Sequence, residues 1–225
     1  MKKILFILLL IGNFCYAQTF SNVGGGNPTG IDPPTFNLQG FVDSTQVLFI
    51  GTKASTPPTD NPTISGDGGR FTFTKRGTVV SGNIRMICYT YTSTKDTTVA
   101  IVFTYAEAQT WFTYQFYTIT FVGAVKKTRM STASNSGSGA DPSIAVPYTA
   151  LSSTAAFFIN DKNPFGATAE SGWSLDFNSG NAFAGICSVH RNSTTDNTVQ
   201  ITAAASVWVG MALQLTKKRI ITIAN

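Results

Sequence analysis

Short runs of β-branched and aromatic residues alternate with polar residues along most of this chain. In the range 70–75, for example, Phe71 and Phe73 alternate with threonines. A period of two residues indicates β-strands, and no helical period of 3.6 residues continues for three turns anywhere. We expect further strands in the ranges 47–51, 83–91, 98–105, 111–122, 143–151, 154–159, 173–177, 182–190, 198–203 and 207–215. This pattern predicts an all-β protein.

The expected strands number about ten and lie roughly 8–12 residues apart, which is typical of a β-sandwich. Strands this short bury one face each, so two sheets have to share a core. We therefore expect the fold class to be all-β, a two-sheet antiparallel β-sandwich of jelly-roll type, forming a single domain over residues 35–225. The Ser-, Gly- and Asn-rich segment 128–142 shows no alternation, and we expect a long loop there. The last six residues, 220–225, could add an edge strand or trail free.

Residues 1–17 have the pattern of a secretory signal peptide. Two lysines precede an apolar run over 4–11, and Ala17 provides a small residue at the expected cleavage point. The run of about eight apolar residues is shorter than the ~20 needed to cross a bilayer. We expect a bacterial protein that is secreted or held at the cell surface, with no membrane span after cleavage; an uncleaved anchor is the alternative. Residues 18–34, rich in Gly, Asn and Pro, are expected to be a flexible lead-in.

Charged residues make up only 12% of the chain, about half of the ~25% typical of globular proteins. Without residues 1–17 the chain would hold 14 Lys and Arg against 11 Asp and Glu, a formal net charge of +3. So few charges do not form the basic stripe of a nucleic-acid-binding protein. We therefore expect no nucleic-acid partner. The single histidine, His190, excludes a metal site made of several histidines.

Catalytic groups are scarce in this sequence. His190 is the only imidazole, and no serine lies in the Gly-x-Ser-x-Gly pattern of a nucleophile elbow. Two carboxylates could cleave a glycan, but the only glutamates are Glu107 and Glu170, and the aspartates lie mostly in turns, where such residues bond the backbone. We therefore expect a protein that is not an enzyme and that has no cofactor.

One turn offers oxygen atoms to a cation. Asp176, Asn178 and Asn181 place side-chain oxygens around Gly180. Ca²⁺ takes six to eight oxygen ligands, so this segment supplies only part of a metal site. A β-hairpin turn at this point explains the same residues and is the interpretation we favour.

Two cysteines, Cys88 and Cys187, follow the expected leader. Both lie in apolar strand patterns, on the side expected to face the core. Export would permit a disulfide, which would close a loop of about a hundred residues and stabilise the fold by ~4–5 kcal/mol. Two separate buried thiols are the alternative, because cysteine is often buried without a partner.

Aromatic residues are concentrated in the range 111–117 (WFTYQFY). Alternation places Trp111 and Tyr117 on one face of a strand, and Phe112, Tyr114 and Phe116 on the other. One face has to be core, and the other could form a flat platform for sugar rings; a central strand covered on both faces is the alternative. The candidate ligand-binding residues are Trp111, Tyr114, Gln115 and Tyr117, with Arg85, Tyr89 and Tyr91 as a smaller second group.

Several segments combine a turn with a strand in a distinctive way: 79–83 (VVSGN), 121–124 (FVGA), 171–173 (SGW), 195–199 (TDNTV), 206–209 (SVWV) and the closing strand 208–215. In these segments the stretch 77–215 resembles the jelly-roll, lectin-like sandwich domains of phage structural proteins and of exported bacterial surface proteins. The resemblance implies a fold of that type and carries over no catalytic residue.

Three functions are compatible with these observations. The sequence favours a non-catalytic exported β-sandwich that works by surface binding or assembly, such as adhesion, with a glycan or a further copy of itself as partner. The resemblance implies, as an alternative, a structural protein of a virion or particle. A glycan-cleaving enzyme on a lectin-like scaffold is the third hypothesis.

Overall fold

The computed structural model describes residues 19–26, 34–58, 61–120, 128–147, 152–161, 166–180, 184–194 and 196–217. Within these residues every regular element is a β-strand. The expected signal peptide, the turn 121–124, Asn181 and the segment 218–225 lie outside the described residues.

The described strands fall into two consecutive groups. The first group, unit 1, consists of β1 (Thr19–Gly26), β2 (Thr35–Gly40), β3 (Thr45–Ala54), β4 (Thr63–Ser65), β5 (Phe71–Ser81), β6 (Ile84–Ser93), β7 (Thr97–Thr104) and β8 (Gln109–Thr120). The second group, unit 2, consists of β9 (Thr128–Gly139), β10 (Ser143–Ala145), β11 (Ser152–Asn160), β12 (Thr168–Ala169), β13 (Ser174–Gly180), β14 (Gly185–Thr194), β15 (Thr198–Thr202) and β16 (Ser206–Lys217).

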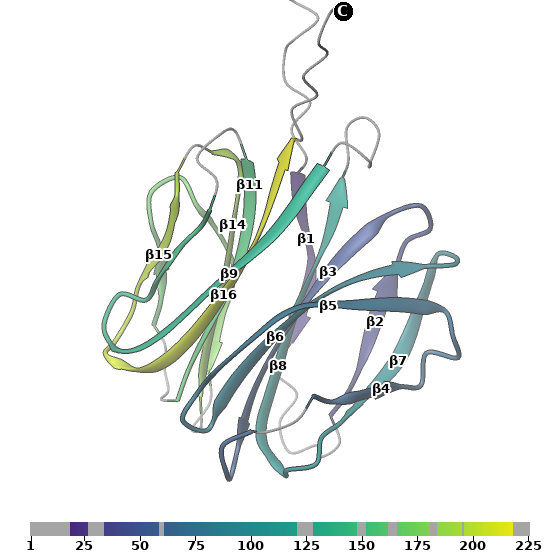
Figure 1. The fold of residues 1–225 in the computed structure, drawn as a ribbon, viewed down its shortest axis with the longest axis horizontal. Coiled ribbons are helices and arrows are strands. Elements are labelled where there is room, and N and C mark those ends of the chain that lie inside the picture. The colour runs from purple at the N-terminus through teal and green to yellow at the C-terminus, as the bar shows by residue number, and fades with distance from the viewer. Residues whose placement is uncertain are drawn as a thin grey trace, which may run out of the picture.

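The two units have the same strand order. Unit 1 has a five-stranded sheet, β1-β8-β3-β6-β5, and a three-stranded sheet, β2-β7-β4. Unit 2 has the corresponding sheets β9-β16-β11-β14-β13 and β10-β15-β12. Consecutive strands alternate between the two sheets through most of each unit, which is the jelly-roll arrangement. The chain thus builds two jelly-roll units in series (Figure 1).

The two five-stranded sheets pack face to face, and each three-stranded sheet covers the outer face of its own unit. Between the five-stranded sheets lies a central core to which both units contribute, including Val47 and Phe49 from β3 and Phe157 from β11. The rings of Phe49 and Phe157 stack with their centroids 5.9 Å apart. A Cβ atom at Gly51 would lie 2.8 Å from Cγ2 of Ile159, so glycine is what allows the sheets to approach this closely.

Each unit also has an outer core between its own two sheets. In unit 1 the outer core includes Leu48 and Ile101, and in unit 2 it includes Phe158 and Ile201. The neighbouring residues of a strand therefore face different cores, as the pleat requires. The described strands form four sheets with three apolar layers between them.

The prediction of an all-β, antiparallel β-sandwich is confirmed, although the structure has four sheets where two were expected. The expected loop over 128–142 is wrong, because residues 128–139 form β9, which pairs with β16 along its whole length. An edge strand held by backbone hydrogen bonds on one side needs little apolar alternation. Part of the expected lead-in 18–34 is also a strand, since β1 pairs with β8.

Candidate functional site

Strands β5 and β13 occupy the same place in their units, and each is interrupted by a β-bulge. The pairing with the neighbouring strand shifts at Arg76 in β5 and at Asp176 in β13. A bulge adds one residue to a strand and turns it out of the regular alternation. At both bulges this extra residue bonds a residue of the other unit.

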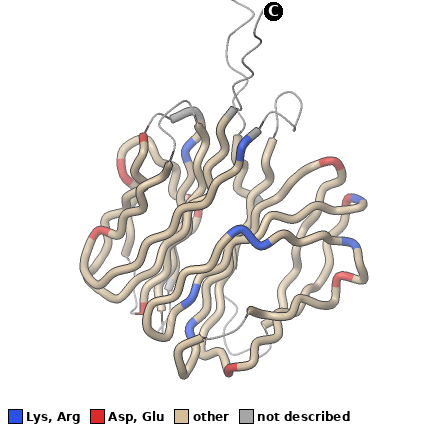
Figure 2. The backbone as a smooth tube through the Cα atoms, in the orientation of Figure 1, with Lys and Arg blue, Asp and Glu red and all other residues tan. Residues whose placement is uncertain are grey.

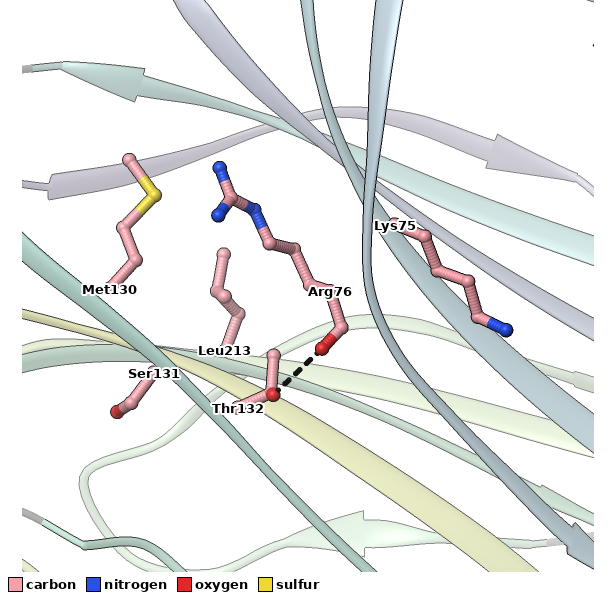
Figure 3. A pocket seen from close by; sticks show the side chains of 6 residues that line it. All are labelled: Lys75, Arg76, Met130, Ser131, Thr132 and Leu213. Carbon is pink, nitrogen blue, oxygen red and sulfur yellow. Dashed lines mark hydrogen bonds between the residues drawn. The ribbon is translucent and has the colours of Figure 1, made fainter.

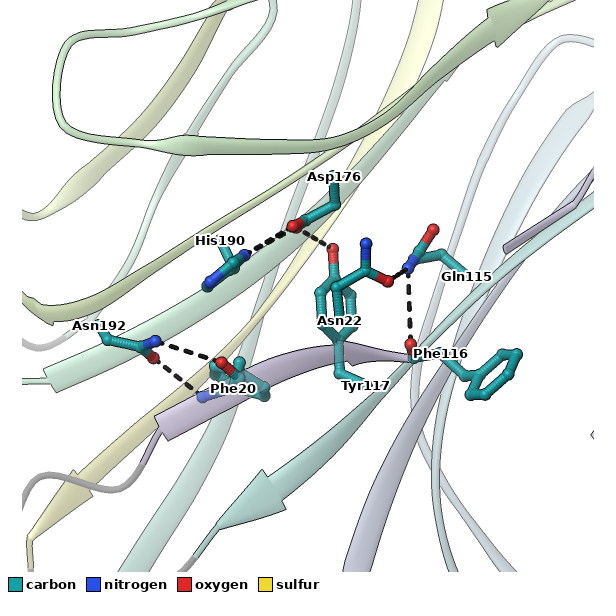
Figure 4. Close-up of polar contacts among 8 residues, drawn as sticks. All are labelled: Phe20, Asn22, Gln115, Phe116, Tyr117, Asp176, His190 and Asn192. Carbon is teal, nitrogen blue, oxygen red and sulfur yellow. Dashed lines mark hydrogen bonds and ion pairs between the residues drawn. The ribbon is translucent and has the colours of Figure 1, made fainter. Parts of the chain in front are cut away.

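Asp176 lies at the contact between the units with two hydrogen-bond partners (Figure 4). The Tyr117 hydroxyl on β8 of unit 1 donates to Oδ2 of Asp176 at 2.7 Å. Nδ1 of His190 on β14 lies 2.8 Å from each carboxylate oxygen. The Asp176 side chain is 5% exposed and that of His190 is 17% exposed. We call Tyr117, Asp176 and His190 the carboxylate cluster.

Burial and charge both act on the tyrosine of this cluster. Burial raises the pKa of Tyr117 well above its usual value, and the negative charge of Asp176 raises it further. The hydroxyl therefore keeps its proton at any ordinary pH and remains a donor to the carboxylate. A buried carboxylate is tolerated only when its oxygens accept hydrogen bonds. The three side chains thus satisfy one another across the junction of the units.

Asn192 reinforces the same side of the junction. Its Oδ1 accepts a hydrogen bond from the backbone N–H of Phe20 at 2.9 Å, and its Nδ2 donates to the Phe20 carbonyl at 3.2 Å. The Asn192 side chain thereby bonds the backbone of the edge strand β1 in the way that a neighbouring strand would. The carboxylate cluster and Asn192 together hold the units against each other, and this is the role their geometry supports.

Arg76, in contrast, lies beside an open pocket between β5 and the strands β9 and β16. The pocket has a volume of about 230 Å³ and is lined by Lys75, Arg76, Met130, Ser131, Thr132 and Leu213. The Thr132 hydroxyl on β9 donates to the Arg76 carbonyl at 3.0 Å. Nε of Arg76 donates to the Thr90 hydroxyl at 2.7 Å. The two terminal nitrogens of the guanidinium have no hydrogen-bond partner among the described residues.

The close view of this pocket shows how its side chains are aimed (Figure 3). The guanidinium of Arg76 lies beside the side chains of Met130 and Leu213, while the Lys75 side chain extends the other way. The ammonium group of Lys75 bonds Oδ1 of Asn61. Arg76 is therefore the cation of the pocket, and we call Arg76, Met130, Thr132 and Leu213 the guanidinium pocket.

The expected aromatic platform is buried on both faces. Trp111 and Tyr117 lie in the central core, whereas Phe112 and Phe116 lie in the outer core of unit 1. The assignment of these residues to opposite faces is confirmed, but a sheet covers each face of β8. No flat aromatic surface is therefore open to a sugar at Trp111 or Tyr117, which are 2% and 0% exposed.

The other two members of the expected platform are held inside the protein. Tyr114 is half-buried and stacks on Phe36 with ring centroids 3.9 Å apart. Gln115 is fully buried and donates from Nε2 to Oδ1 of Asn22 at 2.6 Å. Gln115 thus joins β8 to β1 in its own sheet, and Tyr114 packs against β2 in the facing sheet.

The smaller expected group is also internal. Arg85, Tyr89 and Tyr91 are buried between the two sheets of unit 1. Arg85 forms an ion pair with Glu107 at 3.1 Å, and this pair occupies the carboxylate of one of the two glutamates. The hydroxyl of Tyr91 donates to the Gln39 carbonyl at 2.7 Å.

The residues expected to bind calcium are used in other ways. Asp176 belongs to the carboxylate cluster, and Nδ2 of Asn178 donates to the Ala167 carbonyl at 2.7 Å. The turn expected at 178–180 is not there, because these residues belong to β13 and pair with β14 up to Gly180 and Gly185. Asn181 lies outside the described residues. Asp176 and Asn178 thus bond different partners and do not converge on one point.

The two cysteines are separate buried thiols in the structure. Cys88 faces the central core, whereas Cys187 faces the outer core of unit 2. The sheet that contains β14 lies between these two layers, so a bond between the two sulfur atoms would have to pass through it. The cross-core disulfide considered from the sequence is therefore not formed.

The sequence did not point to Arg76 or to the grouping of Tyr117 with Asp176 and His190. The bulge in β5 left no mark on the apolar pattern. Phe73 and Val79 are six residues apart and would share one face of a regular strand. Phe73 instead packs in the outer core and Val79 packs against the central core, because the bulge lies between them.

Comparison of the chain with known protein families finds no family that matches, and comparison with curated proteins finds no similar protein. Over the described ranges, no helix has the length and apolar character needed to cross a membrane. Over the same ranges, no group of three or more His, Cys, Asp or Glu side chains is placed to hold a metal ion. Function therefore has to be inferred from the fold and from the two bulges.

Proposed function

We propose that this is an exported, non-catalytic protein that works by binding at a surface, with a glycan as its ligand. The observation that carries the proposal is the guanidinium pocket. It offers hydrogen-bond donors of Arg76 that have no partner among the described residues, next to the partly buried side chain of Met130. A sugar ring presents the complementary combination, because it has hydroxyl groups around its edge and C–H groups on its faces. A few placed polar groups on an apolar floor are typical of binding sites.

The fold supports this proposal in a general way. Jelly-roll sandwiches occur in lectins and in viral capsids, where they work by contact and not by turnover. Fold alone does not define function, so the pocket carries more weight. The carboxylate cluster, which holds the acid and base groups most typical of a catalyst, is used to join the two units.

The experiment that tests the proposal is a glycan-array screen of the purified protein, combined with its oligomeric mass from light scattering. We expect selective binding to a limited set of glycans, saturable and at a defined stoichiometry. A protein that binds no glycan and stays monomeric at high concentration would contradict the proposal. Export is tested separately by mass spectrometry of protein from the culture medium, which should begin at Gln18.

A structural protein of a virion or particle is the second candidate. The observation that favours it is the repetition of one jelly-roll unit along the chain, because capsid proteins also use this fold. In that case the protein should copurify with particles at full length, with Met1 or its immediate neighbour at the N-terminus. Its mass in solution should then be a multiple of the chain mass.

A further inference from the structure

We propose that the guanidinium pocket binds a carboxylate-bearing sugar, such as a uronic acid residue of an acidic polysaccharide, with the carboxylate on Arg76. The inference rests on the proposed function, since it names the class of glycan. It depends on three features of the pocket: the fixed guanidinium, the uncompensated positive charge and the size of the cavity.

The first feature is the way in which Arg76 is held. The bulge frees its carbonyl from the strand ladder, and the Thr132 hydroxyl donates to that carbonyl at 3.0 Å. Nε is bonded to the Thr90 hydroxyl at 2.7 Å, so the guanidinium plane has a defined direction. Its two terminal nitrogens then form a fixed pair of donors. Such a pair matches the two oxygens of a carboxylate and forms parallel charge-assisted hydrogen bonds.

The second feature is the charge around the pocket. None of the residues that line it is acidic, and Arg76 forms no ion pair among the described residues. Figure 2 shows Lys and Arg where β5 passes β9, whereas Asp and Glu lie mainly at the outer turns. An anion would therefore be favoured here over a neutral group.

The third feature is the size and floor of the cavity. About 230 Å³ is less than the ~300–1,000 Å³ of pockets that enclose drug-sized molecules, so a single ring fits better than a chain. Met130, which is partly buried, supplies an apolar contact for the C–H face of a ring, and the buried Leu213 lies behind it. The Thr132 oxygen can accept a hydrogen bond from a sugar hydroxyl while it donates to the Arg76 carbonyl. The rest of a polysaccharide would extend into the solvent.

The test compares two sugars that differ only in the group on C5. Methyl glucuronoside carries a carboxylate, and methyl glucoside carries a hydroxymethyl group in its place. We expect the purified protein to bind the glucuronoside at least about 10-fold more tightly in NMR titrations, with an affinity that falls as salt is added. Resonances of Met130 and Leu213 methyl groups should shift on binding.

Variants locate the site. Arg76→Ala should weaken glucuronoside binding by about 10- to 100-fold, the cost of losing charge-assisted hydrogen bonds. Arg76→Lys should restore only part of it, because an ammonium cannot form the parallel pair of bonds. The matched control is Arg70→Ala, which removes an exposed arginine from the turn before β5. Thermal melts of each variant separate loss of binding from loss of folding.

Four outcomes would overturn the inference. Unchanged glucuronoside binding in Arg76→Ala would place the site elsewhere while leaving the proposed glycan binding intact. Equal binding of the two sugars would show that the carboxylate is not recognised. Competition by inorganic sulfate as strong as that by the glucuronoside would show a general anion site and no recognition of a sugar. Absence of binding to any sugar, charged or neutral, would count against the proposed function itself.

Discussion

The two bulges occupy equivalent positions in the two jelly-roll units, yet their extra residues are treated in opposite ways. Asp176 is almost fully buried, and both of its oxygens are bonded by side chains from the two units. Arg76 is exposed, and within the described part of the chain only one of its guanidinium nitrogens is bonded. The same backbone device therefore fixes the junction on one side of the molecule and presents a charged group to solvent on the other.

The difference follows from what surrounds each bulge. On the β13 side, Tyr117 and His190 enclose the carboxylate, and a buried charge has to be paired to be tolerated. On the β5 side, Thr132 bonds the backbone carbonyl of Arg76 while the side chain of Arg76 extends past the contact. Loss of Asp176 should thus damage stability, whereas loss of Arg76 should damage binding alone.

The largest expected effect is that of Asp176→Ala. The change leaves the Tyr117 hydroxyl without its acceptor and His190 without its partner, inside the junction of the units. We expect the free energy of unfolding, measured by urea denaturation, to fall by about 3–5 kcal/mol. Asp196→Ala is the control, because Asp196 and its partner Arg191 are 29% and 32% exposed, and it should cost about 1 kcal/mol. Equal losses in the two variants would contradict the structural role of the cluster.

High pH should have the next largest effect. Burial, and secondly the charge of Asp176, raises the pKa of the Cys187 thiol to about 12. Burial also raises the pKa of Tyr89 to about 12. In the unfolded chain a thiol ionises near pH ~8.5 and a phenol near pH ~10. The stabilisation is therefore complete below about pH 8.5 and is lost as the pH rises towards 12.

Urea titrations at pH 8, 9.5 and 11 should show the free energy of unfolding falling by about 3 kcal/mol or more across that range. Burial raises the pKa of Cys88 as well, and the positive charge of Arg76 offsets only part of that rise. Both thiols therefore keep their protons in the folded protein across this range, so Arg76→Gln should leave the loss unchanged. A free energy of unfolding that stays constant between pH 8 and 11 would contradict the burial of these groups.

The smallest expected effect on stability is that of Arg76→Ala. Its side chain is exposed, and the bond that holds Thr132 uses the backbone carbonyl, which the variant keeps. We expect the free energy of unfolding to change by less than about 1 kcal/mol, measured in the same urea assay. A loss as large as that of Asp176→Ala would mean that both bulges hold the units together.

The strand pattern allowed the faces of individual strands to be predicted, but not the number of sheets that cover them. The assignment of Trp111 and Phe112 to opposite faces of β8 is confirmed. A strand with apolar side chains on both faces can be covered by another sheet on one face or on both, so burial on both faces could not be deduced. β9 was missed because its Ser, Gly and Asn residues are held by backbone bonds to β16, which leave no side-chain pattern.

The repetition of the unit is a property of strand order and is not visible in the residues. The equivalent bulge positions hold Arg76 and Asp176, which have opposite charges. The members of the carboxylate cluster are also far apart in sequence, since Tyr117 and Asp176 are 59 positions apart. Their meeting depends on the register of three strands and on a bulge that changes phase. Nothing local in the sequence specifies such a contact.

The shared central core has a consequence for how the protein is made. When synthesis has reached the end of β8, the inner face of the first five-stranded sheet, with Val47, Phe49 and Tyr117, has no cover, because the strands that cover it come later. A nascent chain at this stage exposes a large apolar surface, and a truncated polypeptide that ends after β8 should aggregate. We therefore expect unit 1 or unit 2 to aggregate when it is expressed alone, and to stay folded when the other unit is co-expressed with it.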